Sequence, residues 1–265
     1  MATIEDPRTN AARVPAQHGS GAFAGRLGNS AKVLVVVYCV SALIYGLAAS
    51  TLPIEPHIPL IAGAVLAGIF GVVIRGLPFH PYPRFGHANL VTALRAGLIS
   101  LVSAVVLFSE TFGRERNDVL IWATAATVLL ALALDGVDGA LARRFHQASP
   151  FGARFDMELD AFLVFILSIA ALVLDKAGAW VLLIGLMRYL FVAAQRFLPW
   201  MRTALPESFR RKLICVVQIA ALCSVMLHFV TEPVSGWVCS TALALLLYSF
   251  AADIRYLNAR RGDEA

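Results

Sequence analysis

Eight stretches of this chain are apolar over roughly the twenty residues that a helix needs to cross a lipid bilayer. Helices are expected there, because an open strand cannot satisfy its backbone in lipid and the runs lack the strict alternation of a barrel. The sequence therefore predicts an all-α, polytopic membrane helix bundle with about eight transmembrane helices. The predicted spans are 32–50, 57–75, 89–109, 118–138, 156–174, 177–196, 212–231 and 234–254.

Composition excludes an ordinary soluble domain. The chain is 59% hydrophobic and 15% charged, whereas soluble domains average about 45–50% apolar and about 25% charged residues. Its net charge of +5 would suit a nucleic-acid partner, but basic loops of a membrane protein produce the same excess.

The positive charges are distributed unevenly between the two sides of the predicted bundle. Of the 22 Lys and Arg residues, 18 fall in the termini and in the connections that share a side with them, and three fall on the other side. Because cytoplasmic segments are enriched in Lys and Arg, both termini are expected in the cytoplasm. The expected location is an integral position in a bacterial inner (plasma) membrane, with no nucleic-acid partner.

Four aspartates lie between two of the apolar runs, in the stretch LDGVDGALARRFHQASPFGARFDMELDA. Asp135 and Asp138 are three residues apart, and Asp156 and Asp160 are four apart, so each pair shares one face of a helix. Antiparallel packing of these helices would make the two pairs face each other near the cytoplasmic side. Such carboxylates repel one another unless a divalent metal ion binds them, and two hard cations could bridge a diphosphate. The alternative is a set of solvated helix-end charges, but ionisable groups at membrane depth are functional by default.

Small residues and an arginine separate the two acidic pairs. Gly136, Gly139 and Gly152 leave room for backbone or ligand, although helix packing also favours glycine. Arg143 lies one turn beyond Gly139 and could hold a phosphate in a fork, or act as a cytoplasmic anchor.

The complete pattern resembles the signature of the CDP-alcohol phosphotransferase family, D-x-x-D-G-x-x-A-R, about eight residues, then G-x-x-x-D-x-x-x-D. All eight fixed positions match between Asp135 and Asp160. The segment NLVTALR, from Asn89 to Arg95, resembles the part of the family's first core helix that lines the nucleotide site. A helix start capped by Asn or Thr is the alternative interpretation of that segment.

The resemblance implies a metal-dependent enzyme that transfers a phosphatidyl group from CDP-diacylglycerol to an alcohol and releases CMP, in phospholipid biosynthesis. It implies two Mg²⁺ or Mn²⁺ ions, with Asp160 also acting as general base, and a homodimer among membrane lipids. The implied metal ligands are Asp135, Asp138, Asp156 and Asp160. The implied contacts to the CDP-linked donor are Asn89, Leu90, Val91, Thr92, Gly139, Arg143, Ser149 and Gly152.

The family core has six helices, so the resemblance also divides the chain. The expected parts are a polar cytoplasmic tail, 1–31; two additional spans with an interfacial connector, 32–88; the core, 89–254; and a cytoplasmic tail, 255–265. The role of the two additional spans is open.

The acceptor is a small alcohol or a phosphorylated polyol, and basic residues near the site favour the latter. Arg188 lies inside an apolar span, where it needs an anionic partner, either a phosphate or a carboxylate of the bundle. Arg211 and Lys212, with Arg210 before them, begin the next span and could bind acceptor phosphate or anchor the helix.

Three other functions remain as alternatives. The same motif serves enzymes that move a phospho-alcohol head group from a CDP-alcohol to diacylglycerol. An intramembrane prenyltransferase also uses Asp-rich helices with Mg²⁺, but its two motifs lie far apart in sequence. A cation transporter predicts internal repeats, whereas the aspartate cluster occurs once in this chain.

Overall fold

The computed structural model describes residues 20–76, 86–144, 150–203, 205–206 and 208–263. The residues in these ranges are mostly helical, and none of them forms a strand. Two short 3₁₀ segments, Ala179–Val181 and Pro199–Arg202, flank α7. The helices are α1 Ser20–Thr51, α2 Ile58–Gly76, α3 His87–Phe108, α4 Glu110–Gly113, α5 Asp118–Arg144, α6 Pro150–Val173, α7 Leu182–Phe197, α8 Phe209–Met226 and α9 Val234–Asp263.

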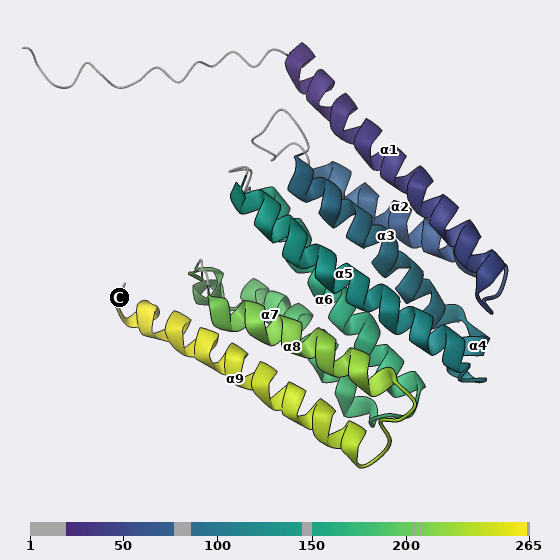
Figure 1. Cartoon of the computed structure of the whole chain (residues 1–265). Helices are drawn as coiled ribbons and strands as arrows, with labels where there is room; N and C mark the ends of the chain where they lie inside the picture. The colour runs from purple at the N-terminus through teal and green to yellow at the C-terminus, as the bar shows by residue number, and fades with distance from the viewer. Residues whose placement is uncertain (1–19, 77–85, 145–149, 204, 207, 264–265) are drawn as a thin grey trace, which may run out of the picture.

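The long helices lie side by side, with α1 along one edge and α9 along the other (Figure 1). All eight predicted spans coincide with long helices, while the short α4 was not predicted. Among the described residues, six helices are long and apolar enough to cross a membrane: α1, α2, α3, α5, α7 and α9. Charged residues lie in the second and third turns of α6 and in the first turn of α8, which leaves each helix a shorter apolar part. The chain is an integral membrane protein with a helical bundle.

Two helices extend beyond their predicted ends. α1 begins at Ser20, before the predicted start at residue 32, and α9 continues to Asp263, past residue 254. Hydropathy marks the part of a helix that sits in lipid, but a helix can continue into water for as long as its residues tolerate the conformation. The apolar pattern therefore located these helices and underestimated their length.

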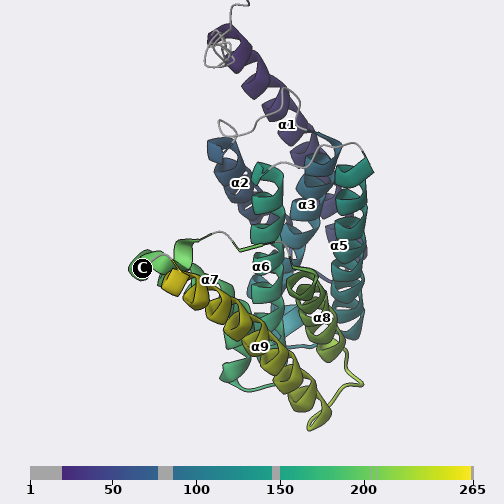
Figure 2. The ribbon, with the colours of Figure 1, turned by 90° about the vertical axis from the view of Figure 1, so that its left-hand side faces the viewer.

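α3 is the central helix of the bundle. Within its apolar span 72% of the residues are buried, against 39% or less for the other five spans. It packs against α1, α2, α5 and α6, and Figure 2 shows it between α2 and α5. A charged side chain on the inward face of α3 must therefore find its partners inside the protein.

The side chains of α1 contact the backbone of α3 at Gly97. The hydroxyl of Tyr45 donates a hydrogen bond to the carbonyl oxygen of Gly97 over 2.7 Å. A Cβ atom at Gly97 would lie 2.4 Å from the Ser41 hydroxyl and 3.2 Å from its Cβ, so a larger residue at this crossing would force the Ser41 side chain to move. The two additional N-terminal helices thus pack directly on the helix that carries Arg95.

The connections opposite the chain termini form what we call the distal end: residues 52–57, 109–117, 174–178 and 227–233. There the carboxylate of Glu55 accepts hydrogen bonds from the backbone N–H and the hydroxyl of Thr111, at 3.0 and 3.2 Å. Partial burial by itself raises the pKa of Glu55, but hydrogen bonds from the Thr111 N–H and the Ser109 and Thr111 hydroxyls outweigh it and lower the pKa to about 2. The ionised carboxylate therefore ties the α1–α2 connection to α4.

Replacing Glu55 by glutamine is expected to lower the thermal unfolding midpoint in detergent by about 2–4 °C at pH 7, as the loss of about 1 kcal/mol would. A carboxyl whose pKa is lowered by folding stabilises the protein above its unfolded value. The difference between wild type and variant should therefore be constant above about pH 5 and shrink as the pH falls toward 2. Glu110→Gln is the matched control, since Glu110 lies in α4 but is exposed. A pH-independent difference would contradict the assigned role.

Candidate active site: three carboxylates around a buried arginine

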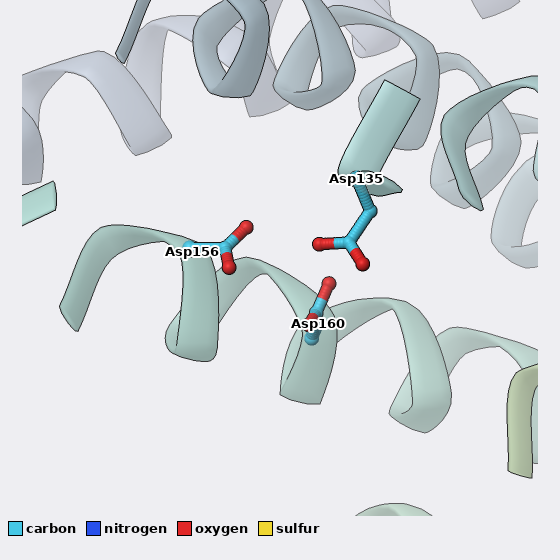
Figure 3. Close-up of side chains that lie close together, drawn as sticks. All are labelled: Asp135, Asp156 and Asp160. Carbon is cyan, nitrogen blue, oxygen red and sulfur yellow. The ribbon is translucent and has the colours of Figure 1, made fainter. Parts of the chain in front are cut away.

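The end of α5 and the start of α6 bring three carboxylates together. Asp135 comes from α5, and Asp156 and Asp160 come from successive turns of α6. Figure 3 shows the three side chains pointing toward one another, and one oxygen of each lies within 4.8 Å of the others. Asp135 is buried, and Asp156 and Asp160 are partly buried. Asp138 lies on α5, but its side chain is outside the described residues.

The guanidinium of Arg95, from α3, contacts all three carboxylates. Its Nη1 pairs with Oδ1 of Asp135 at 3.0 Å and with Oδ1 of Asp156, and its Nη2 pairs with Oδ1 of Asp160 at 2.5 Å. Its Nε donates to the carbonyl oxygen of Ala131 over 3.1 Å. The side chain is 0% exposed. Three helices therefore meet at one buried ionic cluster, which we call the aspartate cluster: Arg95, Asp135, Asp156 and Asp160.

The donor set of the aspartate cluster suits a hard divalent cation. Mg²⁺ and Mn²⁺ prefer carboxylate oxygens, and Mg²⁺ binds them at about 2.0–2.1 Å. Oxygens that already lie within 4.8 Å of one another need only a small inward movement to share such an ion. The carboxylates outnumber the arginine three to one, so negative charge remains for a cation to neutralise. The residues present therefore fit a divalent metal.

The predicted nucleotide contacts lie beside this cluster, as far as they are described. Asn89 and Thr92 are buried and precede Arg95 by two turns and one turn of α3, while Leu90 and Val91 are half-buried. Gly152 lies in the first turn of α6. The side chain of Arg143, Gly139 and the whole of Ser149 lie outside the described residues.

Gly136, which lies between the first two aspartates of the motif, faces open space. A Cβ atom at Gly136, next to Asp135, would meet nothing within 4 Å. Helix packing therefore does not explain this glycine in the described structure, and a ligand beside Asp135 would have room there.

The first half of α8 adds a thiol and a basic turn. The Sγ atom of Cys215 lies 4.0 Å from Oδ2 of Asp160. Arg211 and Lys212 precede Cys215 by one turn of the same helix. Arg211 pairs with Asp253 of α9 at 3.3 Å, and Arg210 pairs with the same carboxylate at 2.5 Å, while Lys212 is exposed. The basic turn therefore lies about one helical turn from the aspartate cluster.

Arg188, the third predicted acceptor contact, has a carboxylate partner inside the bundle. Its Nη2 lies 2.5 Å from Oε1 of Glu158, and its buried Nε has no hydrogen-bond partner among the described residues. Glu158 is two residues from both Asp156 and Asp160, which places it about 200° around α6 from either one. Arg188 thus pairs on a different face of α6 from the aspartate cluster.

Sequence reasoning missed two residues of the site. Arg95 is the one charged residue between positions 89 and 109, and the rule that a charge within a span needs an anionic partner was applied to Arg188 and not to it. Cys215 gave no signal, because a thiol in an apolar run normally packs as a small hydrophobe.

Comparison with known proteins identifies the pattern. Residues 85–248 match the family model described as CDP-alcohol phosphatidyltransferase. A protein of Mycobacterium tuberculosis named "Probable phosphatidylglycerophosphate synthase" is 32% identical over 135 residues, which are 51% of this chain and 63% of that protein. A Pseudomonas fluorescens protein named "CDP-diacylglycerol--glycerol-3-phosphate 3-phosphatidyltransferase" is 33% identical over 95 residues, 36% of this chain and 45% of that one. The chain thus matches less than two thirds of each relative's length. No solved structure matches it.

Proposed function

We propose that this chain, which belongs to the CDP-alcohol phosphatidyltransferase family, transfers a phosphatidyl group from CDP-diacylglycerol to glycerol 3-phosphate and releases CMP. The observation that carries the proposal is the convergence of Asp135, Asp156 and Asp160 in a membrane helix bundle. The two relatives named above suggest the acceptor, since their names specify phosphatidylglycerophosphate and glycerol 3-phosphate.

Asp135, Asp138, Asp156 and Asp160 would hold two Mg²⁺ or Mn²⁺ ions. When bound, such ions neutralise the diphosphate of the donor and the charge that develops on the departing CMP. The donor would lie with its acyl chains in lipid and its cytidine near Asn89–Thr92, Gly139, Arg143, Ser149 and Gly152. Both termini and the site would face the cytoplasm of a bacterial inner membrane, and the protein would act as a homodimer.

Asp160 is the proposed general base. Its carboxylate takes the proton from the acceptor hydroxyl while the hydroxyl oxygen forms a bond to the phosphorus that carries the lipid. The bond from that phosphorus to the oxygen of CMP breaks, and CMP leaves with the electron pair. Asp160 suits this role because it borders α8, from which the acceptor would approach: its Oδ2 lies 4.0 Å from Cys215.

The basic turn of α8 is the proposed partner of the acceptor's phosphate. Arg211 and Lys212 lie one turn from Cys215, on the side of the site that Asp160 borders. For Arg188 to act as predicted, its pair with Glu158 would first have to open. Arg211 also pairs with a carboxylate, that of Asp253. The arrangement of the helices therefore favours the exposed Lys212 over Arg188, with Arg211 beside it.

Lys212→Ala is expected to raise the KM for glycerol 3-phosphate several-fold and to change kcat less, because the removed charge binds ground state and transition state alike. The measurement is initial CMP release as a function of acceptor concentration. Arg255→Ala removes an exposed cation of α9 and should leave both constants unchanged. An unaltered KM in Lys212→Ala would contradict the proposed acceptor contact.

The test of the function is a panel of acceptors. Purified protein receives CDP-diacylglycerol and Mg²⁺ or Mn²⁺ with glycerol 3-phosphate, inositol phosphate, serine, inositol or choline, and the lipid product is identified by mass spectrometry. The proposal expects phosphatidylglycerophosphate and CMP with glycerol 3-phosphate. Turnover with another alcohol would correct the acceptor. Turnover only with CDP-choline or CDP-ethanolamine and diacylglycerol would replace the proposal by head-group transfer.

A further inference from the structure

The guanidinium of Arg95 touches all three carboxylates of the aspartate cluster. Its Nη1 forms ion pairs with Asp135 and Asp156, and its Nη2 forms an ion pair with Asp160. A planar guanidinium presents several N–H donors in a fixed fork, whereas a lysine offers three donors from a single nitrogen. The contact set joins α3, α5 and α6 at one point.

The burial of these charges makes them depend on one another. A fully buried arginine without a partner is strongly destabilising, and three close carboxylates without a cation repel one another. Arg95 is 0% exposed and the Asp135 side chain 9% exposed, so water does little to screen either. In the absence of metal, the positive charge of Arg95 therefore helps the three carboxylates to lie this close.

The same contacts oppose a metal ion. Each of the three aspartates gives one oxygen to Arg95, and one oxygen of each aspartate lies within 4.8 Å of the others, so a cation bound by all three would lie close to the guanidinium. Two positive groups there repel each other, and a metal ion needs oxygen contacts of about 2.0–2.1 Å. The hydrogen bond from Nε to the carbonyl oxygen of Ala131 involves no carboxylate, so it can hold the side chain while the terminal nitrogens move.

We propose that Arg95 is an internal counter-ion of the metal site: it positions Asp135, Asp156 and Asp160 before metal binds, and it gives up at least one of these contacts when metal binds. The inference rests on the proposed function, because it requires that these aspartates bind a divalent cation. Arg95 is thus a positioning residue that stabilises the metal-free protein and competes with the metal ion.

The test compares wild type with Arg95→Gln in detergent at pH 8, using Mn²⁺ as the probe. Thermal unfolding midpoints are measured with EDTA, at saturating Mn²⁺, and across a Mn²⁺ titration that yields the half-saturating concentration. The variant should lose more stability with EDTA than with saturating Mn²⁺, because metal replaces the missing charge. Its half-saturating Mn²⁺ concentration should fall about tenfold, because a competitor has been removed. These readouts do not depend on enzyme activity.

Arg210→Gln is the matched control. Arg210 also pairs with a buried carboxylate, Asp253, and with the carbonyl oxygen of Ser249, but these partners tie α8 to α9. Its loss should lower the midpoint equally with and without Mn²⁺ and leave half-saturation unchanged. The same behaviour in Arg95→Gln, or weaker Mn²⁺ binding, would overturn the inference.

If Arg95→Gln does not fold, the conservative variant Arg95→Lys tests the inference instead. Arg95→Lys keeps the charge and loses the fork, so its half-saturating Mn²⁺ concentration should also lie below that of wild type. A value at or above wild type would overturn the inference. If wild type itself showed no Mn²⁺-dependent stabilisation, the proposed metal site would fail, and the inference with it. A metal response in wild type without the shift in the variants would overturn the inference alone.

Discussion

Replacing Asp160 by asparagine is expected to lower the rate of CMP release by about 10²–10⁴-fold, the usual contribution of a general base. Asparagine is nearly the same size and keeps one oxygen that can contact Arg95 or a metal ion, but it cannot take a proton. Thermal stabilisation by Mn²⁺ together with CDP should therefore persist in the variant. A loss of turnover with retained binding would separate the role of Asp160 as base from its role as ligand.

The matched control is Glu158→Gln, which removes a carboxylate from the same stretch of α6. Glu158 pairs with Arg188 and lies on a different face of the helix from Asp160. This variant should keep CMP release within a few-fold of wild type. Near-wild-type turnover in Asp160→Asn would show that another group takes the proton.

The second large effect is expected at Gly185, where α7 crosses α6. A Cβ atom at this position would lie 2.5 Å from the Cα of Phe165 and 2.6 Å from the hydroxyl of Ser168. Because the nearest atom belongs to the backbone, a side-chain rotation cannot relieve the contact, and the two helices must separate. Gly185→Ala should cost about 1–3 kcal/mol and lower the thermal midpoint by several degrees.

This substitution should also lower activity, because α6 carries Asp156 and Asp160. Gly71→Ala in α2 is the control, since a Cβ atom there meets nothing within 4 Å. It should leave the midpoint unchanged or raise it slightly, as alanine favours a helix over glycine. Equal midpoints for the two variants would contradict the close crossing of α6 and α7.

Local patterns predicted the helices well because a membrane span is a local property of the sequence. The runs around Asn89–Phe108 and Asp118–Gly136 showed their length and hydropathy directly. The short α4 was not predicted, because four residues after an apolar run are too few to show a periodic pattern. The start of α1 at Ser20 was not predicted either, because hydropathy does not mark the part of a helix that lies outside lipid.

The aspartate cluster was only partly predictable. Helical spacing placed Asp156 and Asp160 on one face, and the short connection between α5 and α6 suggested that Asp135 would face them. The partner of a buried arginine, however, depends on which helices cross. Sequence left both a phosphate and a carboxylate open for Arg188, and the structure pairs it with Glu158. For Arg95, only the three-helix packing of α3, α5 and α6 brings the carboxylates within reach.

The central claim is that these carboxylates form the metal site of a phosphatidyl transfer reaction. The most direct measurement is CMP release by purified protein from CDP-diacylglycerol and glycerol 3-phosphate, with Mg²⁺ or with EDTA, for wild type and Asp156→Ala. The thermal unfolding midpoint of Asp156→Ala is measured first at each Mg²⁺ concentration. CMP release by the variant is then compared only at concentrations where the variant is folded. The predicted result is CMP release that requires both acceptor and Mg²⁺ and that is lost in Asp156→Ala. Release at the wild-type rate in EDTA or in folded Asp156→Ala would contradict the claim.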